Sequence, residues 1–103
     1  MKEEFKDLEM VDNKEKQQFE MRVGDGLALI EYKQSPTAIF LVHTEVTSQL
    51  EGKGAATAII EKALDYIDRN HLKLVPLCPL VAAYIKRHPE WNKVLDERVK
   101  IAV

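Results

Sequence analysis

A glycine-rich turn at residues 49–54 is the stretch of this sequence best suited to binding a ligand. It reads Gln49-Leu50-Glu51-Gly52-Lys53-Gly54 and stands directly before a segment with helical periodicity. The first backbone N–H groups of a helix have no partner within the helix, and the helix dipole gives that end a positive potential. Glycines let an anion approach the backbone closely. The turn is therefore a candidate site for a phosphate or pyrophosphate group.

Two familiar phosphate-binding motifs do not fit this turn. A Walker loop requires Ser or Thr directly after its Gly-Lys pair, whereas Lys53 is followed by Gly54. A dinucleotide-binding fingerprint requires a third glycine, and Thr57 occupies that position. On these residues alone two interpretations stay open, a pyrophosphate-binding loop and a glycine turn that only starts a helix.

The segments around the turn predict a single α+β (mixed α/β) domain over residues 1–103 with the element order β-β-β-α-β-α. Period-2 alternation predicts strands and apolar residues at 3.6-residue spacing predict helices, with a hairpin turn at Gly24-Asp25-Gly26. The predicted strands are residues 18–23, 27–33, 37–46 and 72–77, and the predicted helices are residues 53–70 and 80–87. The strand at 37–46 is nearly continuous in apolar character, which predicts a central position in the sheet.

The two ends of the chain have weaker patterns. Residues 1–17 are rich in charge and predict an extended arm or a poorly paired edge strand, with residues 1–12 only loosely ordered. At the other end, apolar side chains indicate a tail that packs on the domain, without deciding between strand and helix. These side chains are Trp91, Val94, Leu95, Val99 and Ile101.

Over approximately residues 12–92, the sequence resembles a compact, single-domain subgroup of the GNAT superfamily of acyl-CoA N-acyltransferases. The turn matches the Gln/Arg-x-x-Gly-x-Gly/Ala signature of that family. Further matching blocks occur in order along the chain: His43-Thr44-Glu45-Val46, Gly52-Lys53-Gly54-Ala55-Ala56, Pro76-Leu77-Cys78-Pro79 and the run from Tyr84 to Trp91. The resemblance implies a reduced GNAT-like fold, with an antiparallel three-strand meander, a crossover helix, a parallel strand and a second helix.

The same resemblance implies a binding site for acetyl-CoA or coenzyme A. In this family the amides of the turn hold the pyrophosphate, which assigns that role to the amides from Leu50 to Ala55. Lys53 is either a neighbour of the phosphate or a solvated lysine at the start of the helix. The residues expected to contact the cofactor are Val46, Gln49, Leu50, Glu51, Gly52, Lys53, Gly54, Ala55 and His88.

Acyl transfer to an amine needs a base for the amine proton, and residues 43–45 offer candidates. His43 and Glu45 are two positions apart on one predicted strand, so they share a face and Thr44 faces the other side. The resemblance gives Glu45 the role of the base, acting directly or through water, with His43 beside it. The alternatives are a glutamate at the solvated end of the strand and a histidine that is hydrogen-bonded in the core.

Cys78 follows the parallel strand, at the sheet edge where ligands of such folds collect. A thiolate there could accept the acetyl group first, if a neighbour such as His43 activates it. The alternatives are an inert buried cysteine and one that merely lies near the ligand.

Tyr84 matches the tyrosine that protonates the leaving thiolate in larger GNAT enzymes, although the asparagine and the Gly-Phe pair that usually frame it are missing. The alternative for Tyr84 is core packing. His88 is expected to hold an acidic partner or to cap the helix, besides its place near the cofactor. His43, Glu45, Cys78 and His88 are metal-ligating types, but no close-spaced pair among them predicts a metal site.

Composition limits the remaining classes of function. The chain has 103 residues, 46% hydrophobic and 31% charged, as in an ordinary globular domain. Its net charge of −2 provides no general attraction for nucleic acid or an anionic membrane. A single cysteine excludes an internal disulfide framework. The sequence shows no signal-peptide or membrane-length apolar run, so the expected location is the cytoplasm.

The expected function is therefore an N-acetyltransferase that binds acetyl-CoA and acetylates an unidentified amine on a small molecule or a protein, by direct attack or through Cys78. The alternative is a non-catalytic coenzyme A-binding sensor or a protein-interaction module. Larger GNAT members carry helices between their first two strands, where this chain has only the hairpin turn Gly24-Asp25-Gly26. The resulting bare face of the sheet is either an open acceptor site or the interface of a homodimer.

Overall fold

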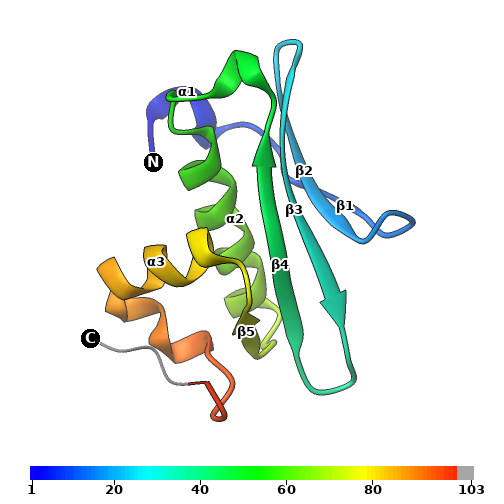
Figure 1. The fold of residues 1–103 in the computed structure, drawn as a ribbon, viewed down its shortest axis with the longest axis vertical. Helices are drawn as coiled ribbons and strands as arrows, with labels where there is room; N and C mark the ends of the chain where they lie inside the picture. Colours follow the sequence, from blue (N-terminus) through cyan, green and yellow to red (C-terminus); the bar gives the residue numbers. More distant parts are fainter. Residues whose placement is uncertain (100–103) are drawn as a thin grey trace.

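The computed structural model describes residues 1–99 of the chain, and a mixed sheet with the strand order β1-β2-β3-β4-β5 forms its framework (Figure 1). The strands are β1 (Val11–Asn13), β2 (Gln18–Val23), β3 (Gly26–Gln34), β4 (Ile39–Val46) and β5 (Leu74–Pro76). The first four strands pair antiparallel in sequence order, and β5 pairs parallel to β4. The predicted α+β class, the meander and the parallel strand after a crossover helix are confirmed.

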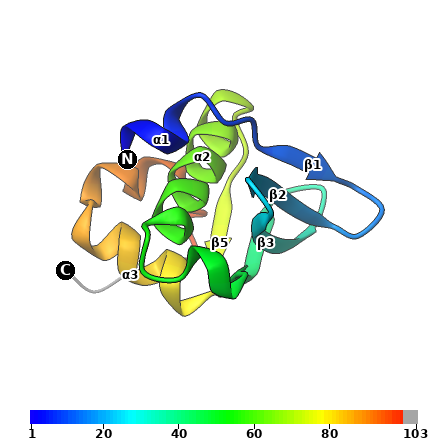
Figure 2. The same ribbon diagram turned by 90° about the horizontal axis from the view of Figure 1, so that it is seen from above.

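The helices lie on one face of this sheet, and the other face is bare within residues 1–99 (Figures 1 and 2). They are α1 (Glu3–Lys6), α2 (Ala55–Arg69) and α3 (Pro79–Arg87), with the 3-10 helices η1 (Ser48–Leu50) and η2 (Pro89–Val94). The inner face of the sheet and α2 form one apolar core, in which Met21, Ile30, Leu41 and Leu64 are fully buried. Within residues 1–99, every helix is too short or too polar to span a bilayer.

The long helix α2 agrees closely with its prediction over residues 53–70. Its buried residues Ile59, Ala63, Leu64 and Ile67 recur at three- or four-residue spacing and pack on the sheet. The helix ends where the sequence predicted, because Asn70 folds back and its side-chain amide donates to the Tyr66 carbonyl oxygen at 2.8 Å.

Residues 1–12 differ from the loosely ordered arm that the sequence predicted. They contain α1, whose Phe5 is only 1% exposed and belongs to the main core. The Lys62 ammonium of α2 donates to the Lys6 carbonyl oxygen at 3.2 Å. The apolar residues of this segment, such as Phe5, Leu8 and Met10, are separated by charges and are too few to define a period, so the sequence did not reveal this anchor. Strand β1 does pair at the edge of the sheet, as the second interpretation predicted.

The tail after α3 forms η2 and then touches the sheet. Val94 is buried in the core, and Leu95 forms an isolated parallel bridge with Leu74 of β5. The Asp96 N–H donates to the Leu74 carbonyl oxygen at 2.9 Å. The tail therefore packs as predicted, while Ile101 lies outside the described residues.

A bulge in β4 changes which side chains face the core. The pairing with β3 runs from Tyr32–Leu41 directly to Glu31–His43, so Val42 is an extra residue. Before the bulge the odd-numbered residues of β4 are buried, and after it Thr44 is buried while its neighbours are exposed. The bulge thus determines which face of the sheet each side chain of residues 43–46 points to.

Candidate functional site

Only part of the glycine turn is free to bind a ligand. The N–H groups of Leu50, Glu51 and Lys53 already donate, at 2.9, 3.3 and 3.2 Å, to the carbonyl oxygens of Thr47, Ser48 and Leu50 respectively. The N–H groups at positions 52 and 54–57 have neither a backbone acceptor nor a side-chain cap among the described residues. The predicted anion site therefore narrows to these amides at the start of α2.

The start of α2 lacks the groups that usually cap a helix. The N-cap residue is Gly54, with a φ of 89° in the left-handed region, and the first turn contains no acidic residue. A side-chain oxygen at the N-cap or a carboxylate in the first turn would have satisfied these donors and offset the dipole. This end of a 15-residue helix thus keeps its donors and its positive potential for an external anion.

Two lysines add positive charge at this end of α2. Lys53 is exposed within the turn. Lys2 extends over Gly54 from the start of α1, because a Cβ built at Gly54 would lie 3.4 Å from Lys2 Cε and 3.7 Å from Lys2 Nζ. Sequence analysis missed Lys2, and no pattern could have indicated it, since the contact depends on how α1 packs.

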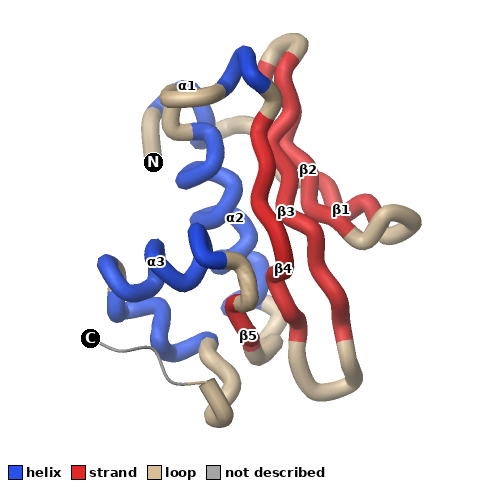
Figure 3. The backbone as a smooth tube through the Cα atoms, in the orientation of Figure 1, coloured by secondary structure: helices blue, strands red, loops and turns tan. Residues whose placement is uncertain are grey.

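Beside the turn, β4 separates from β5. The two strands pair only at residues 39–41 of β4, and the Cys78 N–H adds a bond of 2.8 Å to the Leu41 carbonyl oxygen. Figure 3 shows β5 alongside only the first part of β4. Residues 42–46 consequently have no strand partner on this side among the described residues, and we call this stretch the free edge.

The free edge offers backbone hydrogen-bonding groups. On the other side of β4, the Thr47 N–H donates to the Leu27 carbonyl oxygen of β3 at 2.9 Å. Because bonding to an antiparallel partner alternates along a strand, the backbone groups of Thr44 and Val46 point away from β3 and toward the free edge. An extended ligand with amide groups can pair there, and the role of Val46 in cofactor binding stays a prediction.

His43 and Glu45 lie on the bare face of the sheet, next to the free edge. Their side chains are 53% and 65% exposed, and His43 Nε2 lies 3.7 Å from Glu45 Oε1. The predicted common face is confirmed, and Thr44 points the opposite way. The structure places His43 at the surface rather than in the core.

Cys78 contacts Thr44, not His43. Cys78 is 2% exposed, and its Sγ lies 3.3 Å from Thr44 Oγ1. Either atom can donate the hydrogen bond. His43 projects from the other face of β4, so the expectation that it activates the thiol is not supported. Cys78 is also the residue before the first turn of α3.

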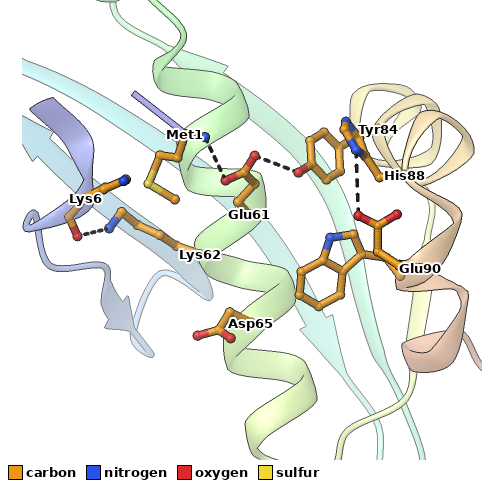
Figure 4. A pocket seen from close by; sticks show the side chains of 9 residues that line it. Met1, Lys6, Glu61, Lys62, Asp65, Tyr84, His88 and Glu90 are labelled. Carbon is orange, nitrogen blue, oxygen red and sulfur yellow. Dashed lines mark hydrogen bonds and ion pairs between the residues drawn. The ribbon is translucent and has the colours of Figure 1, made fainter. Parts of the chain in front are cut away.

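Tyr84 and His88 lie apart from the turn, in a pocket between α1, α2 and the α3–η2 segment (Figure 4). The Tyr84 hydroxyl group donates to Glu61 Oε1 at 2.7 Å. Burial raises the pKa of Tyr84 well above its usual range, and this hydrogen bond acts in the same direction. The pocket has a volume of about 640 Å³, and its lining includes neither Cys78 nor any residue of the turn.

His88 packs against Tyr84 and pairs with an acid. The two rings are stacked at 4.3 Å, and His88 Nδ1 lies 3.9 Å from Glu90 Oε2. This is the acidic partner that the sequence allowed for His88. The geometry therefore fits the structural alternatives for both Tyr84 and His88, and sequence analysis missed Glu61 because a charged residue on a helix is ordinary.

The family described as GCN5-related N-acetyl-transferase matches residues 18–94. The chain belongs to this family. The matched residues span β2 to η2 and include the free edge, the glycine turn and Cys78, so the GNAT resemblance is confirmed. Membership of the GCN5-related family identifies N-acetyl transfer as the class of reaction.

Proposed function

We propose that this GCN5-related protein uses acetyl-CoA to acetylate an amine. The observation that carries the proposal is the group of free amides at positions 52 and 54–57, at a helix end without a cap or an acid. These donors, with Lys2 and Lys53 nearby, suit the pyrophosphate of coenzyme A. A site built for a neutral ligand would not need this concentration of donors and positive potential.

The free edge supports the placement of the rest of the cofactor. Coenzyme A continues from its pyrophosphate into an extended arm with two amide groups, and the backbone groups of Thr44 and Val46 point to where such an arm would lie. From the turn the arm leads back along β4 toward Cys78. The thioester would then lie where β4 and β5 separate.

The two faces of β4 divide the reactants in this proposal. The acetyl group arrives beside Thr44 and Cys78 on the inner side, and the amine approaches from the bare face, where Glu45 and His43 accept its proton. The bare face thus serves as the acceptor side. Two chemical routes agree with this arrangement: direct attack of the amine on the thioester, and transfer through an S-acetyl group on Cys78.

The test combines mass spectrometry with a turnover assay. We expect a native mass spectrum of the protein with acetyl-CoA to show a 1:1 complex. Release of coenzyme A thiol should follow when amino acids, polyamines or peptides with free amino groups are supplied. An acetyl adduct that survives denaturation, and that Cys78→Ala lacks, would support the covalent route. A complex without turnover of any amine would support a binding module instead, and no complex would overturn the proposal.

A matched pair of glycine variants locates the binding site. Gly52 and Gly24 both have positive φ, 74° and 59°, and an added Cβ meets no atom within 4 Å at either position. Gly52→Ala and Gly24→Ala should therefore cost similar stability through backbone strain. We expect only Gly52→Ala to weaken acetyl-CoA binding, by about tenfold in calorimetry, because residue 52 provides one of the free N–H groups of the proposed site. Equal loss in both variants would contradict this location.

A further inference from the structure

Thr44 is a polar residue in a core position. Thr44 is 7% exposed, and its side chain lies on the face of β4 that Ile39 and Leu41 occupy before the bulge. A buried hydroxyl group costs free energy unless it is hydrogen-bonded, and a valine of the same shape would avoid that cost. Among the described residues, Cys78 Sγ is the partner of its Oγ1, at 3.3 Å.

This contact is too weak to explain a buried threonine by stability alone. A thiol is a weak donor and a weak acceptor, so the hydrogen bond with neutral Cys78 contributes little. A hydrogen bond from a hydroxyl group to a thiolate is considerably stronger, because the acceptor is charged. Thr44 is also β-branched and hence stiff, so its hydroxyl group has few alternative positions. The hydrogen bond between Thr44 and Cys78 is therefore strongest when Cys78 is ionised.

The pair lies at the point where a ligand on the free edge would end. The Cys78 N–H makes the last bond to β4, at the Leu41 carbonyl oxygen, and the backbone of Thr44 faces the free edge just beyond it. The bulge at Val42 brings Thr44, and not His43, to the inner face beside the sulfur. The local irregularity of β4 is therefore what creates the pair.

We propose that Thr44 is the positioning residue of Cys78, holding its sulfur toward the free edge and donating a hydrogen bond to the thiolate during acetyl transfer. This inference rests on the proposed acetyl-CoA site. In the step concerned, a bond forms between Cys78 Sγ and the acetyl carbonyl carbon, and the bond from that carbon to the coenzyme A sulfur breaks. The proton that Cys78 loses is the one that the departing coenzyme A thiol gains. The amine nitrogen then attacks the S-acetyl carbon, so that the amide C–N bond forms and the bond to Cys78 Sγ breaks, and the proton that the amine loses restores the Cys78 thiol.

Alkylation by iodoacetamide tests the pair without any cofactor. Cys78 is the sole cysteine of the chain, so labelling reports this thiol alone. Thr44→Val keeps the shape and removes the hydroxyl group, and Thr44→Ser keeps the hydroxyl group. We expect the labelling rate at pH 7 to fall about tenfold in Thr44→Val, with the pH–rate profile moved to higher pH, and to stay near wild type in Thr44→Ser. Thermal unfolding should show Thr44→Val as stable as wild type or more so.

Each other outcome decides against the proposal. An unchanged pH–rate profile in Thr44→Val would mean that Thr44 only packs against Cys78 and does not stabilise its thiolate. Absence of labelling of the wild type up to pH 10 would show that no acyl donor reaches the sulfur.

In the transfer assay, Thr44→Val should lower kcat and leave KM for acetyl-CoA within about twofold. If the wild type neither binds nor turns over acetyl-CoA, the proposed function fails, whereas the labelling result still reports whether Thr44 controls the thiol.

Discussion

At the scale of single residues, β4 presents alternating chemistry to the two sides of the sheet. His43 and Glu45 stand on the bare face, and Thr44 reaches Cys78 on the inner face. In the proposed function, the acyl donor and the amine therefore meet at the free edge from opposite sides. Tyr84 lies outside this arrangement, in a separate pocket where its hydroxyl group donates to Glu61 of α2.

Tyr84→Phe separates a structural tyrosine from a proton donor. We expect kcat for acetyl transfer to change by less than about twofold, and the free energy of unfolding to fall by about 1 kcal/mol through the lost hydrogen bond. Steady-state kinetics and urea unfolding measure the two quantities. Glu61→Gln, which retains an oxygen acceptor, should lose less stability than Tyr84→Phe. A fall of kcat of about a hundredfold or more at unchanged stability would instead assign proton donation to Tyr84.

At the scale of elements, the sequence was most informative where periodicity is long. Helix α2 and the meander were predicted because many residues repeat one pattern, and the glycine turn was located by its residue types. The bulge at Val42 was not predictable, since an extra residue in a strand leaves the apolar composition unchanged. The partner of Cys78 was missed because simple alternation shows that neighbouring residues of β4 lie on opposite faces, but not which set of residues packs on the core after the bulge.

A carboxylate placed in the first turn of α2 should separate helix stability from ligand binding. Thr57 is exposed and three residues after the N-cap Gly54, where a glutamate can reach back to the free N–H groups. We expect Thr57→Glu to raise the free energy of unfolding by about 0.5 kcal/mol. The same carboxylate would repel the pyrophosphate, so affinity for acetyl-CoA should fall at least about tenfold.

Thr57→Gln is the matched control for that experiment, because it has the same length without the charge. It should bind acetyl-CoA within about threefold of wild type. Chemical denaturation and calorimetry on the three proteins give both quantities. Unchanged affinity in Thr57→Glu would place the anion elsewhere than at the start of α2.

At the scale of the whole molecule, two buried tyrosines connect separate parts of the fold. Tyr32 of β3 donates to Asp12 of β1 at 2.6 Å, and Tyr84 of α3 donates to Glu61 of α2 at 2.7 Å. These hydrogen bonds connect the edge strand β1 to β3 and helix α3 to helix α2. They could not be predicted from the sequence, since each joins residues at least 20 positions apart through polar atoms that follow no periodic pattern.

These connections should make the protein sensitive to alkaline pH. Burial raises the pKa of Tyr32 and of Tyr84 well above the usual range, and the hydrogen bonds to Asp12 and Glu61 add to the effect. The unfolded chain loses these protons near pH 10, whereas the folded protein retains them. Their contribution to stability is therefore complete below about pH 10 and is lost progressively as the pH rises further.

The measurement is the melting temperature between pH 8 and pH 11.5 for the wild type and for the double variant Tyr32→Phe/Tyr84→Phe. We expect the wild type to be the more stable protein at pH 8 and the difference to shrink steadily above pH 10. Ionisation of lysines affects both proteins alike and cancels in the difference. Tyrosinate absorbance at 295 nm should rise together with unfolding for these two residues. A difference in melting temperature that stays constant to pH 11.5 would mean that the two phenols ionise in the folded state, and that the connections they make are open to solvent.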